Sequence, residues 1–140
     1  MQNSNIKFTM HISQHSQRSK ISYEACANFF FKDELYYLFF DEVNDEGEIT
    51  KCRFEIDDSR LRMRRNGPII VDQVNISSKK STGYIKTPFG HMDTTLRTFQ
   101  YSFSKRGDET YHLDLGYDMY AGGEKTGMYL LEIVIIKKEN

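Results

Sequence analysis

The sequence contains no tryptophan, only two prolines and two cysteines, and charges that nearly cancel. Its 19 basic and 20 acidic residues leave a net charge of −1, which argues against a nucleic-acid or membrane-surface partner. No apolar stretch approaches the roughly 20 residues that a membrane-spanning helix needs. The opening residues, MQNSNIKFTMHIS, have neither the basic start nor the apolar core of a secretory signal. We therefore expect a cytoplasmic protein with no membrane or nucleic-acid partner.

The two cysteines are expected to remain free thiols. Strand alternation places Cys26 on a polar face and Cys52 on the face of Phe54 and Ile56. A disulfide needs Cα atoms within about 7 Å and converging Cβ vectors, which opposite faces do not provide. The cysteines and the four histidines also lack the spacing of metal ligands, so we expect no metal and no cofactor.

Aromatic and β-branched residues dominate what is present. Nine tyrosines and ten phenylalanines accompany runs that alternate between apolar and polar residues, as in IKFTMHIS at 6–13. Turn signals such as NDEGE (44–48), NGP (66–68) and KRGDE (105–109) separate these runs. The pattern predicts nine or ten antiparallel strands in a single domain spanning residues 1–140.

So many short strands must hide their edges, either in a two-sheet sandwich or in a closed barrel. The stretch GHMDTTLRTFQYSF (90–103) favours the barrel, because its apolar residues change phase. They occupy even positions from Met92 to Leu96 and odd positions from Phe99 to Phe103. A β-bulge near Thr98 would cause this change and supply the bend that a barrel strand needs. The alternative is that another segment covers the second half from outside. We predict an all-β, closed antiparallel barrel of about 8–10 strands.

Three segments resemble the YwiB-like family of small bacterial β-barrel proteins, whose domain has no assigned function. They are RLRMRRNG (60–67), TPFGHMDTTL (87–96) and LDLGYDMYAGGE (113–124), in this order and followed by an alternating terminal strand. The resemblance extends from about Ile6 to Ile136. It implies a calycin-type barrel, similar in architecture to lipocalins and fatty-acid-binding proteins. It implies no activity, ligand or catalytic residue, since a shared fold is a weak argument for function.

No catalytic signature accompanies these strands, so we expect no enzyme. In GGEKTG (122–127), Glu124 interrupts the phosphate-binding loop pattern, and a strand rather than a helix follows. No G-x-S-x-G nucleophile elbow occurs.

The first functional hypothesis is a non-catalytic barrel that binds a small, partly apolar molecule. Small side chains on the inward face could leave space between the aromatic ones. The candidate interior ligand-binding residues are Tyr23, Ala27, Thr94, Leu96, Thr98 and Tyr117.

The second hypothesis is a ligand-free interaction module that uses the aromatic hairpin FFFKDELYYLFF (29–40). With a turn over residues 32–34, Leu35, Tyr37 and Phe39 are expected inside. The candidate interface residues Tyr36, Leu38 and Phe40 then face out. A tucked segment, a second subunit or a ligand at the rim would have to cover them. Among partners, a homodimer is the main expectation.

A further hypothesis concerns RLRMRR (60–65), which together with Lys79 and Lys80 could contact a phosphate. Alternation places Arg60 and the candidate anion-binding residues Arg62 and Arg64 on one side of this strand, where they either pair with acidic neighbours or bind an anion.

Overall fold

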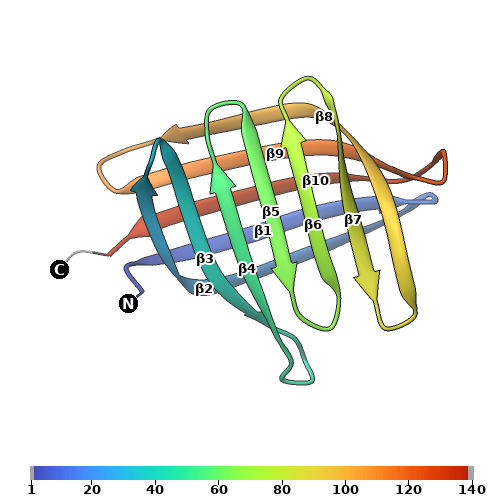
Figure 1. The fold of residues 1–140 in the computed structure, drawn as a ribbon. Coiled ribbons are helices and arrows are strands. Elements are labelled where there is room, and N and C mark those ends of the chain that lie inside the picture. The colour runs from blue at the N-terminus through green and yellow to red at the C-terminus, as the bar shows by residue number, and fades with distance from the viewer. Residues whose placement is uncertain (1, 139–140) are drawn as a thin grey trace.

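The computed structural model describes residues 2–138 and shows one closed, ten-stranded antiparallel barrel (Figure 1). Strands that follow one another in the chain are neighbours in the sheet, and β1 closes the barrel against β10. No helix in the described part of the chain is long and apolar enough to cross a membrane. The strands are β1 (Ser4–Gln14), β2 (Gln17–Lys32), β3 (Leu35–Val43), β4 (Ile49–Ile56), β5 (Arg60–Asn66), β6 (Ile70–Ile76), β7 (Lys80–Thr87), β8 (Gly90–Lys105), β9 (Thr110–Ala121) and β10 (Glu124–Lys137).

The predicted fold is confirmed, and alternation explains the core. Along β5, for example, Leu61 and Met63 are buried while Arg62 and Arg64 lie on the outer face. Cys52 is buried and Cys26 is exposed, and both are free thiols, as expected. The largest fully buried side chains are Phe29, Phe54, Ile6, Leu38, Ile56, Leu61, Leu96, Leu113, Leu115, Ile133, Ile135 and Asn75.

The predicted bulge in β8 is present. The pairing of β8 with β9 shifts by one residue between Thr98 and Gln100, so Phe99 is the extra residue. Thr98 faces the interior before the bulge, and Tyr101 packs against the core after it. Phe99 itself is 49% exposed and lies over Gly116, where an added Cβ would be 2.7 Å from its ring. The bulge therefore lets one long strand keep apolar side chains inside on both sides of a bend.

The predicted orientation of the hairpin 29–40 is wrong. Leu38 and Phe40 are 0% and 2% exposed and point into the barrel, and Tyr36 packs against the core. These three residues therefore cannot form an external interface. The outward set, which includes Tyr37 and Phe39, is half-buried.

The length of the turn explains the error. Lys32 pairs with Leu35, so the turn contains two residues, Asp33 and Glu34, both with positive φ as a type I′ turn requires. The prediction assumed a turn of three residues. One residue of difference moves every following side chain of a strand to the opposite face.

Candidate functional site

The six residues predicted to bind a ligand inside the barrel lie on its inner face, but that interior is filled. Leu96 and Ala27 are 0% exposed, and Thr98, Tyr117 and Thr94 are 1%, 3% and 4% exposed. Side chains lining a cavity of ligand size would keep surface accessible to water, whereas these five have almost none, as expected of a close-packed core. Tyr23, the sixth, is half-buried. Five of the six therefore belong to the buried core of the barrel, and Tyr23 lies on the inner face beside them.

A charged cluster fills the interior near Tyr23. The Glu42 carboxylate accepts hydrogen bonds from the Tyr23 hydroxyl, at 3.0 Å, and from the Arg65 guanidinium, at 2.5 Å. Burial, and then the Glu42 charge, raise the pKa of Tyr23 well above its ordinary value. Burial likewise raises the pKa of the Cys52 thiol to about 11, despite the nearby Arg65 charge. The Tyr23 hydroxyl and the Cys52 thiol therefore stay protonated at neutral pH.

A buried chain of polar side chains ties β6 to β8. The Gln73 amide donates to Asn75 Oδ1 at 2.8 Å, and the Asn75 amide donates to Thr98 Oγ1 at 3.0 Å. A buried polar group is costly unless it is hydrogen-bonded, so this chain fixes the relative position of the two strands. Between them lies β7, which pairs with β6 over only four residues.

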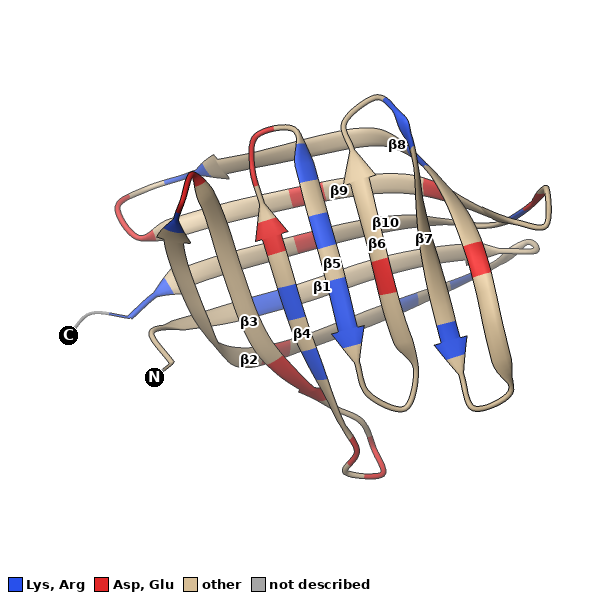
Figure 2. Cartoon of the chain, viewed as in Figure 1, with Lys and Arg blue, Asp and Glu red and all other residues tan. Residues whose placement is uncertain are grey.

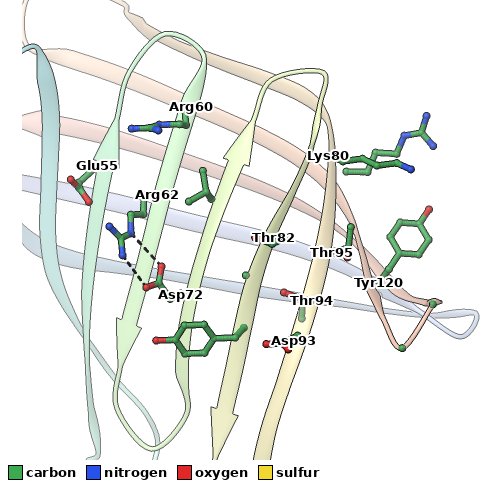
Figure 3. Close-up of a pocket in the computed structure, with 16 residues that line it drawn as sticks. Glu55, Arg60, Arg62, Asp72, Lys80, Thr82, Asp93, Thr94, Thr95 and Tyr120 are labelled. Carbon is green, nitrogen blue, oxygen red and sulfur yellow. Dashed lines mark hydrogen bonds and ion pairs between the residues drawn. The ribbon is translucent and has the colours of Figure 1, made fainter.

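The outer face of this region carries a groove of about 1090 Å³ that extends over β4–β9 (Figure 3). Its volume is at the upper limit of typical small-molecule sites. The turn between β9 and β10 forms one boundary, and Val74 contributes apolar surface. The groove is lined by Glu55, Arg60, Arg62, Asp72, Val74, Lys80, Thr82, Gly83, Tyr84, Asp93, Thr94, Thr95, Arg97, Tyr120, Gly122 and Gly123.

One end of the groove is cationic. Arg60 begins β5, Lys80 begins β7, and Arg97 is the direct cross-strand partner of Lys80 on β8. Figure 2 shows basic residues along β5 and at the top of β7. Figure 3 places Arg60 on β5 and Lys80 on β7, both near the upper ends of the strands, with their side chains on opposite sides of the groove and pointing away from each other. All three side chains are exposed, and none forms an ion pair with an acidic side chain among residues 2–138. This end therefore carries three uncompensated positive charges.

Core contacts hold the cationic strand ends in place. The Tyr101 hydroxyl lies 2.9 Å from the Arg60 carbonyl oxygen and 2.7 Å from that of Asp57, which anchors the start of β5 from inside the barrel. The Thr98 amide donates to the Lys79 carbonyl at 3.2 Å, next to Lys80. The bulged part of β8 thus positions the backbone of both walls.

The middle of the groove is electrostatically neutral. Arg62 makes a bidentate contact with the carboxylate of Asp72, with Nη2 at 3.1 Å and Nε at 3.3 Å. This hydrogen bonding raises the pKa of Arg62 further. Arg64 is 3.5 Å from Glu55. Arg62 and Arg64, the two arginines predicted to bind an anion, are therefore paired with acidic residues, as the alternative interpretation of the sequence predicted. Arg60 and Lys80 from the same predicted set have no acidic partner among the described residues.

The other end of the groove carries an aromatic ring and a carboxylate. Tyr84 and Asp93 are cross-strand partners on β7 and β8. The Tyr84 ring stacks on His91, with ring centroids 5.2 Å apart. His91 Nε2 is also 2.8 Å from Asp93 Oδ1. The imidazole thus holds the ring and the carboxylate next to each other.

Sequence reasoning grouped Lys80 with the arginines of β5, but it did not identify Arg97 or Tyr84, and it formed neither the Lys80–Arg97 nor the Tyr84–Asp93 pair. The pairs Lys80–Arg97 and Tyr84–Asp93 are each defined by the register of β7 with β8. The TPFG turn (87–90) was visible as a turn signal, and Thr87 pairs with Gly90 across it. Counting back from that two-residue connection would have placed both pairs correctly.

The fold and the groove define the class of protein as a closed ten-stranded antiparallel barrel with a filled interior and a charged outer groove. The chain belongs to the family described as "Domain of unknown function (DUF1934)", whose model matches residues 6–133. No curated protein matches the sequence.

Among solved structures, the chain is similar to the ywiB protein from Bacillus subtilis. The match has a TM-score of 0.83 and covers 99% of this chain and 93% of the other. Sequence identity is 16%, so the likeness shows the shared barrel fold and transfers no function.

Proposed function

We propose that this protein is a non-catalytic binding protein for a small anionic molecule, held in the outer groove of β4–β9. The observation that carries the proposal is that Lys80 and Arg97, which are cross-strand partners, and Arg60 on the opposite wall line the groove without acidic partners in the described chain. Guanidinium and ammonium groups make strong, charge-assisted hydrogen bonds to carboxylate and phosphate oxygens. An anionic group is the complement that this end of the groove lacks.

The groove also supports a ligand that is only partly polar. Val74, Tyr84 and Tyr120 offer apolar or aromatic surface within the same space. The expectation of a small, partly apolar ligand is therefore retained, with its site moved from the filled interior to the outer face. A concave site with much apolar surface and a few convergent polar groups is the usual form of a small-molecule site.

The chemistry of the groove favours binding over catalysis. Its cations are arginine and lysine side chains, which donate hydrogen bonds and accept none. Arg62, whose pKa is raised, is still less able to release a proton. The groups with strongly raised pKa values, Tyr23, Cys52, Tyr101 and Tyr117, instead lie in the core or pack against it.

The proposal is tested by calorimetric titration with inorganic pyrophosphate, at low salt because screening weakens exposed charge interactions. The test variant is Arg60→Gln, Lys80→Gln and Arg97→Gln combined. The control variant is Arg18→Gln, Lys20→Gln and Arg106→Gln, which removes the same charge outside the groove. We expect binding by the wild type and the control, and at least tenfold weaker binding by the groove variant.

Two results would overturn the proposal. One is the absence of pyrophosphate binding by the wild-type protein. The other is an equal loss of affinity in the groove and control variants, because the effect would then come from net charge rather than from the groove.

A further inference from the structure

Chemically different side chains follow one another in steps along the outer face of β7 and β8. Successive outward positions on a strand are two residues, or about 6.6 Å, apart. The cationic end and the aromatic end of this row are therefore separated by roughly 13 Å. The cross-strand pairs, in order, are Lys80–Arg97, Thr82–Thr95 and Tyr84–Asp93.

We propose that the ligand of the groove is a nucleoside phosphate, an inference that rests on the proposed function and specifies its ligand. The phosphate would bind between Lys80 and Arg97, which are direct cross-strand partners. The sugar would lie over the hydroxyls of Thr82 and Thr95. The base would lie at the end formed by Tyr84 and Asp93.

The aromatic end has the groups that recognise a base. Tyr84 is half-buried, and its stacking on His91 fixes its orientation, so a planar ring can bind there at low cost in side-chain entropy. Asp93 is 89% exposed at the side chain and contacts His91 through Oδ1. A carboxylate only accepts hydrogen bonds, so it selects a base edge that carries N–H donors, as guanine does.

Simpler anions match the groove less well. Inorganic phosphate would use the cationic end alone and leave Tyr84 and Asp93 without a partner. A fatty acid would place an apolar chain over Thr82, Thr95 and Asp93, which would lose water without gaining hydrogen bonds. A nucleoside phosphate offers an anion, hydroxyls and a planar ring with donors in the order in which the groove presents their complements.

The test compares guanosine monophosphate with ribose 5-phosphate by calorimetric titration at low salt. Stacking of a base on an aromatic side chain is worth about 1–3 kcal/mol, so we expect guanosine monophosphate to bind roughly tenfold tighter or more. Tyr84→Leu should abolish that advantage and leave the affinity for ribose 5-phosphate unchanged. Tyr37→Leu is the control, since Tyr37 lies on the outer face of β3 and does not line the groove.

Asp93→Asn provides a second variant at an exposed position, where the fold tolerates the change. It should weaken the binding of guanosine monophosphate more than that of ribose 5-phosphate. Equal affinities of the wild type for the two compounds would overturn the nucleoside phosphate and leave the anion groove standing. An effect of Tyr37→Leu as large as that of Tyr84→Leu would overturn it as well. If neither compound nor pyrophosphate binds, the proposed function itself fails.

Discussion

The orientation of the hairpin 29–40 leads to a quantitative prediction for Leu38→Ala. Leu38 is 0% exposed and lies opposite Phe29 on β2 and Phe54 on β4, each of which is 1% exposed. The substitution removes three side-chain carbons at about 0.8 kcal/mol each, and the enclosed site leaves a cavity that adds to the cost. We expect the free energy of unfolding to fall by about 3 kcal/mol, a large part of the 5–15 kcal/mol typical of a domain.

Urea unfolding followed by far-ultraviolet circular dichroism measures this loss. With a slope near 2 kcal/mol/M, the midpoint should move by about 1.5 M. The matched control is Tyr37→Ala, the next residue along β3. It deletes a larger side chain from the outer face, where the ring is half-buried and stacks on Phe30 at 5.1 Å. Loss of that aromatic pair should cost about 1 kcal/mol.

The order of the two costs is decisive. Suppose instead that Tyr37→Ala destabilises the protein by about 3 kcal/mol and Leu38→Ala by less than about 1 kcal/mol. The inner and outer faces of β3 would then be reversed, and the two-residue turn would be wrong. If a homodimer forms through this hairpin, the outward set that includes Tyr37 and Phe39 must mediate it. In that case the wild-type midpoint would depend on protein concentration, and Tyr37→Ala would weaken that dependence.

Two further predictions concern the groove floor and the interior. Gly83→Ala should lower the free energy of unfolding in urea by about 1–3 kcal/mol, because an added Cβ would lie 2.7 Å from the Asp72 carbonyl oxygen. The control is Thr82→Ala at the neighbouring exposed position, and an equal cost for both variants would contradict the clash. Burial raises the pKa of Cys52 from 9.0 to about 11 and that of Tyr117 from 10.0 to about 12, so the native state holds these protons more tightly than the unfolded chain. The contribution of these two groups to the free energy of unfolding is therefore fully present below pH 9 and is lost between pH 9 and 12. Each group lowers the free energy of unfolding by about 1.4 kcal/mol per pH unit between its unfolded and its native pKa. Cys52→Ala should reduce the slope between pH 9 and 11. Stability that rises with pH over this range would refute the assignment.

Local pattern determined much of the barrel. A side-chain period of two is a property of the strand itself, so the inward placement of Ala27, Thr94 and Leu96 could be inferred without knowing any neighbour. The phase change around Thr98 likewise identified the bulge, because a single inserted residue is the simplest way to exchange the faces of a strand.

Register lay beyond that local pattern. In residues 29–40 both faces are apolar, so alternation could not choose between Leu38 and Tyr37 as the inward residue. The choice depended on whether the turn holds two residues or three, and pairing of Lys32 with Leu35 settled it. Filling of the interior also lay beyond the sequence, because it depends on how side chains from all ten strands meet.

The groove shows most clearly which features follow from local pattern and which depend on strand register. The sequence alone identified Arg62 and Arg64 as neighbours on one strand face, and it could not show that Asp72 and Glu55 neutralise them. Lys80 and Arg97 are 17 positions apart in the chain and become a pair only when β7 and β8 align. The sequence by itself determined the strands and their faces, because alternation is local. Tertiary structure decided which charges meet, because the distance between two side chains on different strands depends on the alignment of those strands.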